Sequence, residues 1–175
     1  EISREDFAAV TEKISRAVEA MKAAGTEQPT EFEMLTAMAF LYFAEQDVAY
    51  AVIEVGMGGL LDSTNVVLPV MSVITNVALD HTAYCGTTVE EIARHKAGII
   101  KDGVPVITAA DGAALDAVAE RAAAKGAPLC VLGKDIAVTR RSLEKAAAGG
   151  LVQHLRLRFT GGKETSLELP LLCCL

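Results

Sequence analysis

The chain has 175 residues, with 16 Lys or Arg and 23 Asp or Glu, so its formal net charge at pH 7 is −7. This acidic balance argues against a nucleic-acid binder, which usually carries a basic excess. Because 51% of the residues are hydrophobic, the chain is too apolar for a disordered protein, and its length predicts a single domain over residues 1–175. No segment has the length and apolarity of a membrane span or the pattern of a signal peptide, so we expect a soluble protein without a membrane partner.

The cysteine pattern favours a reducing compartment. Cys85, Cys130, Cys173 and Cys174 show no C-x-x-C spacing, which indicates neither a zinc site nor a disulfide scaffold. We therefore expect the four cysteines to be small core side chains of a cytoplasmic protein. Because the sequence begins with Glu1 rather than Met and stops in an apolar run, we expect it to be a piece of a longer chain.

Two helices are predicted at the start of the chain. Ser3 can cap the first helix, and Gly25 would end it. Thr30 and Glu33 form a T-x-x-E capping box that opens a second helix through about Glu45. One face of this second helix is fully apolar: Phe32, Leu35, Ala39 and Phe43.

The pattern then changes to short apolar strands. The runs at 49–55, 71–77, 104–108 and 128–132 are typical of buried parallel strands, and helical stretches are predicted at 88–97 and 113–125. This alternation predicts an α/β fold with a mostly parallel sheet flanked by helices. Alternating apolar residues at 155–159 and 167–171, separated by Gly161-Gly162-Lys163, predict a small antiparallel hairpin with one buried face.

The first candidate functional residue is Glu54, at the end of the first predicted strand and just before the sequence GMGG at 56–59. Ligands of open parallel sheets bind beyond the carboxyl ends of the strands, and glycines allow close approach there. A solvated turn carboxylate is the alternative. The glycines do not form G-x-G-x-x-G, because Leu61 occupies the last position, so a dinucleotide site is poorly supported.

The second candidate group follows the next predicted strand, in the sequence NVALDHT at 76–82. His81 could ligate a metal, with Asp80 orienting its ring, at the same edge of the sheet as Glu54. The alternative is a loop histidine bonded to backbone, and we assign that ordinary role to His95 and His154.

The third candidate is Lys96. It lies on the inward, apolar stripe of the helix opened by the capping box of Thr88 and Glu91. Burying a charged lysine ammonium there is costly unless it pairs with an anion or loses its proton. A lysine that has become a neutral amine can react with carbon dioxide to form a carbamate. The alternative is a lysine whose head reaches water. No G-x-x-x-x-G-K-[ST] motif occurs in the sequence.

Three segments together resemble a known family. TEFEMLTAMAFLYFAEQDVAYAVIEVGMGGLLDSTNVV, SVITNVALDHT and TVEEIARHKAGIIKDGVPVIT closely resemble the central domain of the folylpolyglutamate synthase/dihydrofolate synthase group of Mur ligases. The resemblance implies an ATP-dependent ligase that adds L-glutamate to folate or dihydropteroate through an acyl phosphate. It also implies that this chain is the latter part of the ATPase domain, without the P-loop segment and the C-terminal domain.

The resemblance assigns roles to the candidate residues. Glu54 resembles a ligand of the Mg²⁺ that bridges the ATP phosphates, and His81 resembles a histidine near a second Mg²⁺. Lys96 resembles the lysine that is carbamylated and supplies that second ion with an oxygen. His81 and Lys96 are therefore the expected catalytic residues, while Asn76 and Asp80 are expected to orient cofactor or substrate.

One position departs from the family pattern. The family usually has arginine after the glycine pair, whereas this sequence has Leu60. Two alternatives remain: a Mur-type ligase acting on a peptidoglycan precursor, and a non-catalytic paralogue. We expect the isolated chain to be inactive and, with apolar faces uncovered, to self-associate.

Overall fold

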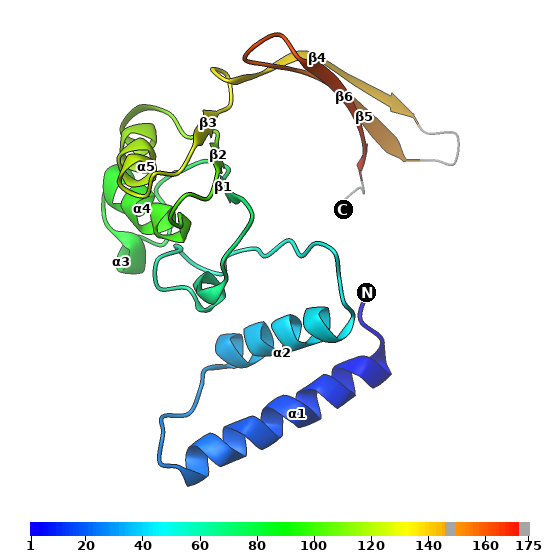
Figure 1. Cartoon of the computed structure of the whole chain (residues 1–175), viewed down its shortest axis with the longest axis vertical. Helices are drawn as coiled ribbons and strands as arrows, with labels where there is room; N and C mark the ends of the chain where they lie inside the picture. The colour runs from blue at the N-terminus through cyan, green and yellow to red at the C-terminus, as the bar shows by residue number, and fades with distance from the viewer. Residues whose placement is uncertain (146–149, 172–175) are drawn as a thin grey trace. The chain divides into compact units, whose positions relative to one another are not determined.

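The computed structural model describes residues 1–145 and 150–171 (Figure 1). The chain divides into two compact units, one of Glu1–Met57 with Leu61–Val67 and the other of Gly58–Leu60 with Leu68–Leu175. The single domain expected over residues 1–175 stays a prediction. Within the described ranges, no helix is both long and apolar enough to cross a membrane.

The first unit is a pair of helices whose ends match the sequence predictions. Helix α1 (Arg4–Ala23) begins after Ser3, whose Oγ accepts a hydrogen bond from Asp6 N at 3.0 Å. Helix α2 (Glu31–Glu45) begins with the predicted capping box, in which Glu33 N donates to Thr30 Oγ1 at 3.2 Å and Thr30 N donates to Glu33 Oε2 at 2.7 Å. Both predicted helices are confirmed, because a cap is a local interaction that needs no tertiary partner.

Burial in the first unit is modest. The helices bury Val10 and Val18 of α1, and Thr36 and Met38 of α2. The predicted apolar face of α2 lies open at Phe32, which is 42% exposed. A short 3₁₀ helix, η1 (Ser63–Val66), completes the regular elements of this unit.

The predicted strand at 49–55 is wrong. This segment has neither strand nor helix, and Tyr50 and Val52 are 84% and 95% exposed. A strand is defined by hydrogen bonds to a neighbouring strand, and no described strand pairs with this segment. Its apolar, β-branched composition is therefore not sufficient to make it a strand.

The second unit contains the predicted parallel sheet. Its strands are β1 (Ser72–Ile74), β2 (Val106–Thr108) and β3 (Leu129–Val131), in the order β1-β2-β3. The register pairs Ser72 with Val106 and Val106 with Leu129, and both ladders are parallel. All three strands are shorter than the apolar runs that predicted them.

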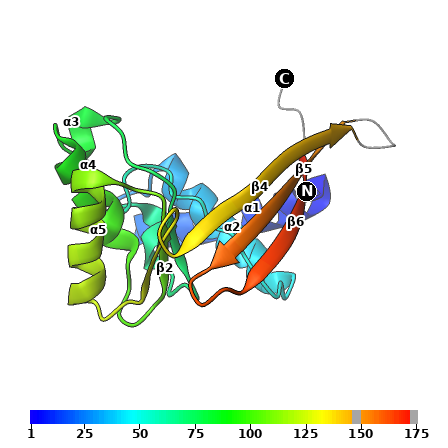
Figure 2. The same ribbon diagram turned by 90° about the horizontal axis from the view of Figure 1, so that it is seen from above.

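Helices cover one face of this sheet. The helical elements of the unit are α3 (Thr82–Cys85), α4 (Val89–Lys96), η2 (Ala97–Ile99) and α5 (Gly112–Ala124). Both views place α4 and α5 on the same side of the sheet (Figures 1 and 2). The uncovered face carries Val73, which is 54% exposed, so β1 is buried on one face and not on both as its sequence suggests.

The core of the second unit lies between the sheet and these helices. Its larger buried side chains are Ile74, Ile100, Val106 and Val118. Alanines of α4 and α5 form an adjoining cluster, which allows the two helices to pack closely. Buried Thr108 is satisfied, because its Oγ1 donates to Ile74 O at 2.9 Å and accepts from Ala110 N at 3.0 Å.

An antiparallel sheet forms the rest of the second unit. Its strands are β4 (Ile136–Lys145), β5 (Leu151–Phe159) and β6 (Glu164–Leu171), in that order. The predicted hairpin is confirmed as β5–β6, whereas sequence reasoning missed β4. The predicted buried face is wrong, because Leu167 and Leu169 of β6 are 40% and 41% exposed. Alternation places these leucines on one face, but only a second layer would have buried them.

Candidate functional site

A glycine loop packs on the turn that follows α4. Leu60 N donates to His95 O at 3.0 Å. A Cβ added to Gly59 would lie 2.9 Å from Lys96 O, and one added to Gly98 would lie 2.4 Å from Leu60 Cβ. Two backbones can approach this closely only where side chains are missing, so the glycines hold the loop against the end of the helix that carries Lys96.

Gly58 lies against two side chains that are distant from it in the sequence, those of Cys85 and His95. It has a left-handed φ of +68°, and a Cβ added there would lie 2.3 Å from His95 Nδ1 and 2.9 Å from Cys85 Sγ. Cys85 is buried, and His95 Nδ1 is a buried atom without a hydrogen-bond partner among the described residues. His95 is therefore packed under the glycine loop and does not have the backbone-bonded side chain that we assigned to it.

Lys96 is the last residue of α4 and is half-buried. Ile92 and Ala93, on the same stripe, are 1% and 0% exposed, so the inward stripe of this helix is confirmed. Lys96 forms no ion pair with any side chain in residues 1–145 and 150–171. No carboxylate of these residues holds the Lys96 amine, and its conversion to a carbamate stays a prediction.

His81 lies where the chain turns into α3. Its backbone is left-handed, with φ 50° and ψ 39°, which is uncommon for a residue other than glycine. Asp80 accepts a hydrogen bond from His81 N at 2.8 Å and has its other oxygen 3.6 Å from His81 Nε2. Asp80 thus contacts both the backbone and the ring of His81, as an orienting carboxylate would. Asn76 is exposed two residues after β1.

Glu54 belongs to the first unit, whereas His81 and Lys96 belong to the second. It is exposed and lies in the segment that does not form a strand. The expectation that it ends a strand is therefore wrong. A common site for these three residues stays a prediction.

Asp62 is the best-connected carboxylate near Glu54, and sequence reasoning assigned it no role. Its Oδ2 accepts from Met57 N at 2.9 Å, and its Oδ1 accepts from Thr64 N at 2.9 Å and Thr64 Oγ1 at 2.5 Å. Partial burial raises the pKa of Asp62, but the hydrogen bonds from Thr64, Met57 and Gly56 outweigh it and the net pKa is lowered. Asp62 stays ionised and closes the loop that follows Glu54.

Carboxylate oxygens suit a hard cation such as Mg²⁺, and each unit by itself offers one at a candidate position, Glu54 in the first and Asp80 in the second. No three His, Cys, Asp or Glu side chains of the described chain converge closely enough to hold a metal by themselves.

One local signal in the sequence could have found Asp62. The spacing D-x-T is typical of a carboxylate that bonds the backbone two residues ahead, as Asp62 does with Thr64. The contact of Gly58 with Cys85 and His95 had no such local signal, because these residues are distant in sequence.

Comparison with known families and proteins gives a consistent result. The model of the Mur ligase middle domain matches residues 7–172. The dihydrofolate synthase/folylpolyglutamate synthase of Bacillus subtilis is 50% identical over 109 residues, which cover 62% of this chain and 25% of that protein.

Solved structures show the same similarity. A single-substitution variant of L. casei folylpolyglutamate synthase (FPGS) matches with a TM-score of 0.83 and 38% identity, over 94% of this chain and 40% of that one. The FPGS–AMPPCP–folate complex matches with a TM-score of 0.77 and 40% identity, over 87% of this chain and 36% of that one. The chain thus spans between a quarter and two fifths of the length of these relatives.

Proposed function

This chain belongs to the Mur ligase middle-domain family, and we propose that it is part of an ATP-dependent ligase that joins L-glutamate to folate or dihydropteroate. The observation that carries the proposal is the fold match to L. casei FPGS, which covers 94% of this chain at 38% identity. The FPGS–AMPPCP–folate complex supports both ligand classes, because that related protein binds an ATP analogue and a folate.

The proposed reaction needs an activated carboxyl group. A carboxylate is a poor electrophile, so the folate carboxylate takes the γ-phosphoryl group of ATP to become an acyl phosphate. The amine of L-glutamate then attacks the acyl carbon and phosphate leaves. Enzymes of this kind contribute mainly by positioning the reactants and stabilising charge.

Within this proposal, the chain's own residues hold ions and orient substrate. Mg²⁺, when bound, would neutralise charge on the ATP phosphates. Glu54 is the proposed ligand of that ion, whereas His81 and a carbamylated Lys96 are the proposed ligands of a second Mg²⁺. His81 and Lys96 are the proposed catalytic residues. Asn76 and Asp80 are proposed to orient nucleotide or substrate, and the contact of Asp80 with His81 supports that role for Asp80.

A ligation assay tests the proposal. The intact gene product that carries this chain is incubated with Mg-ATP, L-glutamate and either folate or dihydropteroate. Release of phosphate that depends on both acceptor and glutamate, with a product heavier by one glutamyl residue, is the expected result. Phosphate release that instead requires a peptidoglycan precursor would identify the other Mur-type activity, and no dependence on any acceptor would indicate a non-catalytic paralogue.

The isolated 175-residue chain should hydrolyse almost no ATP. Its sequence contains no Walker A loop, whose backbone amides and lysine cradle phosphates in nucleotide sites of this kind. For the same reason it should bind Mg-ATP weakly at best, and isothermal titration with Mg-ATP measures that affinity. Submicromolar affinity would contradict the expectation and reveal another phosphate site.

Exposed apolar side chains support the proposal that the isolated chain self-associates. Several are more than three quarters exposed, namely Tyr50, Val52, Leu61, Val66, Leu68, Val70 and Tyr84. Apolar surface of this kind tends to pair with another chain. Light scattering over a concentration series tests it, and a monomer at every concentration would exclude it. A cytoplasmic location is part of the same proposal, favoured by the free thiols of Cys85 and Cys130.

A further inference from the structure

The antiparallel sheet is basic in an otherwise acidic protein. Between Ile136 and Leu171 the sequence has six Lys or Arg and three Asp or Glu, whereas the whole chain has a net charge of −7. Charge of one sign gathered on one element raises the local concentration of the opposite ion. The excess does not lie on the face of this sheet that carries a pocket, where Arg140, Arg156 and Arg158 are balanced by Glu144, Glu164 and Glu168. An anion site on that face depends instead on the local pairing of two arginines.

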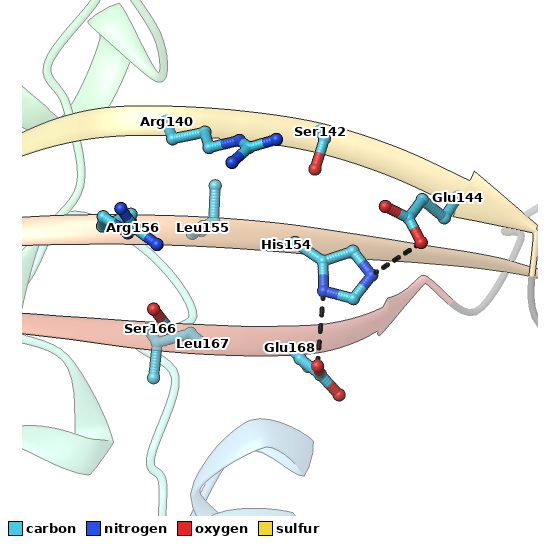
Figure 3. A pocket seen from close by; sticks show the side chains of 9 residues that line it. All are labelled: Arg140, Ser142, Glu144, His154, Leu155, Arg156, Ser166, Leu167 and Glu168. Carbon is cyan, nitrogen blue, oxygen red and sulfur yellow. Dashed lines mark ion pairs between the residues drawn. The ribbon is translucent and has the colours of Figure 1, made fainter.

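The polar face of this sheet holds two arginines directly opposite each other. Arg140 of β4 pairs in register with Arg156 of β5, and Ser166 of β6 lies opposite Arg156 on the other side. These residues line one end of an open pocket of about 300 Å³ (Figure 3). Like charges directly opposite in a ladder destabilise a sheet unless something neutralises them.

Neither guanidinium has a carboxylate partner within residues 1–145 and 150–171. The two carboxylates that line the pocket, those of Glu144 and Glu168, lie beside His154 instead, at the other end, while Glu164 pairs in register with Arg158. His154 Nε2 lies 3.7 Å from Glu144 Oε2, and His154 Nδ1 lies 3.4 Å from Glu168 Oε1 (Figure 3). One end of the pocket thus holds two arginines, and the other end holds two carboxylates that lie beside His154.

We propose that the Arg140–Arg156 pair is a binding site for an oxyanion, either a carboxylate or a phosphate group. Guanidinium groups are planar, always charged, and bind both kinds of oxyanion through two parallel hydrogen bonds. The hydroxyls of Ser142 and Ser166 line the same pocket and can add neutral donors. A bound anion would neutralise the cross-strand repulsion, so binding and sheet stability are coupled.

This inference goes beyond the proposed ligase reaction, since none of the residues proposed for that reaction lines this pocket. Two ligand sources share the chemistry: the carboxylates of glutamate and the phosphate groups of a nucleotide. The test therefore uses two probes on the 175-residue chain, L-glutamate and inorganic phosphate, and monitors backbone amide resonances of β4 to β6 by NMR. It needs no ligase activity, so its outcome is separate from that of the ligation assay.

We expect saturable shifts of the Arg140 and Arg156 amides with at least one probe. Because a charge-assisted hydrogen bond contributes on the order of tenfold in affinity, Arg140→Gln with Arg156→Gln should weaken binding by at least about tenfold. Arg141→Gln is the matched control, because Arg141 is the next residue of β4 and lies on the opposite face of the sheet. It should change the affinity by less than about twofold.

The melting temperature gives a second measurement on the same variants. Phosphate or glutamate should raise it for the wild-type chain and for Arg141→Gln, and not for the double variant. Arg156→Lys keeps the charge without the paired donors, so it should retain only part of the affinity. Saturation by one probe alone would identify that source. Absence of saturation by both, or equal loss in Arg141→Gln, would overturn the proposal.

Discussion

The two sheets of the second unit differ in what buries them. Each parallel strand has three residues, yet Ser72, Ile74, Val106 and Thr108 are at most 4% exposed. The antiparallel strands have eight to ten residues, yet only Ile136 and Gln153 are buried among their described side chains. In this unit the longer strands are therefore the less buried ones.

The difference follows from the layers beside each sheet. Helices α4 and α5 cover one face of the parallel sheet with closely packed alanines, whereas the leucine face of the antiparallel sheet remains about half exposed. Burial, and with it most of the stabilisation by apolar surface, comes from a second layer. Helix α4 also carries Lys96, so the proposed catalytic residue lies in the helix-covered part of the unit and the proposed oxyanion site in the solvated part.

The largest expected effect is on the activity of Lys96→Ala in the intact gene product. Loss of a charge-stabilising group should lower turnover by about 10²–10³-fold. The fold should persist, because alanine is the best helix former. Small carboxylates such as acetate should restore part of the activity if the lost group is a carbamate, and small amines if it is an ammonium.

Turnover of this variant is measured with each additive. Lys134→Ala, an exposed lysine between β3 and β4, is the control and should leave turnover unchanged. Rescue by amines and not by carboxylates would refute the carbamate assignment. An unchanged rate in Lys96→Ala would show that the helix-covered region carries no catalytic group at this position.

A core substitution compares the two sheets directly. Ile100 is 1% exposed beneath the parallel sheet, so Ile100→Ala should cost about 2–5 kcal/mol of unfolding free energy. Leu169 is 41% exposed in β6, so Leu169→Ala should cost less than about 1 kcal/mol. Urea unfolding followed by circular dichroism measures both, and equal costs would mean that the leucine face is covered by another layer.

Alanine substitutions at two glycines distinguish the cost of steric contact from the cost of backbone strain. Gly58 and Gly103 have φ of +68° and +70°, but only Gly58 has side chains within 4 Å of an added Cβ. Both alanine variants carry the strain of a left-handed residue, about 1–2 kcal/mol. Gly58→Ala should cost about 1–3 kcal/mol more, because it also overpacks the space beside His95 and Cys85.

The second half of this experiment adds His95→Ala to Gly58→Ala. Removing the imidazole should recover part of the lost unfolding free energy, whereas His95→Ala should not help Gly103→Ala. Thermal unfolding of the four variants gives the result. If Gly58→Ala and Gly103→Ala are equally stable, the glycine loop does not pack on α4 as the structure has it.

The smallest expected effect lies outside both sheets, at Asp62. Because its folded pKa is lowered from the ordinary 3.8, its ionised form stabilises the loop above that value, and this stabilisation is lost as the pH falls through the lower folded pKa. Asp62→Asn should therefore cost about 1 kcal/mol at pH 7 and progressively less below pH 3.8.

Thermal unfolding of Asp62→Asn and the wild-type chain between pH 7 and pH 3 measures this convergence. Thr64→Val removes one hydrogen-bond donor to Asp62 and should reproduce part of the pH dependence. A difference between Asp62→Asn and the wild-type chain that is constant with pH would mean that the carboxylate is not held by these hydrogen bonds.

Local features were predictable from the sequence. The caps at Ser3, Thr30 and Thr88 lie where the sequence predicts them, because each hydrogen bond joins residues three apart. The contact between Asp80 and His81 needed only adjacent residues. The inward position of Lys96 followed from helical periodicity, which depends on neighbours along one helix.

Pairing and burial were less predictable. The apolar segment at 49–55 has strand-like composition and no strand partner, whereas the polar sequence of β4 forms a strand because β5 pairs with it. Gly58 meets His95 and Cys85 across a long stretch of sequence. Such contacts depend on which segments become neighbours, and composition does not encode that.

By itself, the sequence determined the approximate bounds of α1, α2, α4 and α5, the parallel α/β character, the hairpin and the candidates Glu54, His81 and Lys96. Periodicity and capping depend only on residues close together in the sequence, so they can be recognised without the tertiary structure. Only the tertiary structure decided which faces are buried, which glycine touches His95, and that Arg140 stands opposite Arg156. Those outcomes depend on register and on the presence of a second layer, because burial and cross-strand contact belong to pairs of elements and not to any one of them.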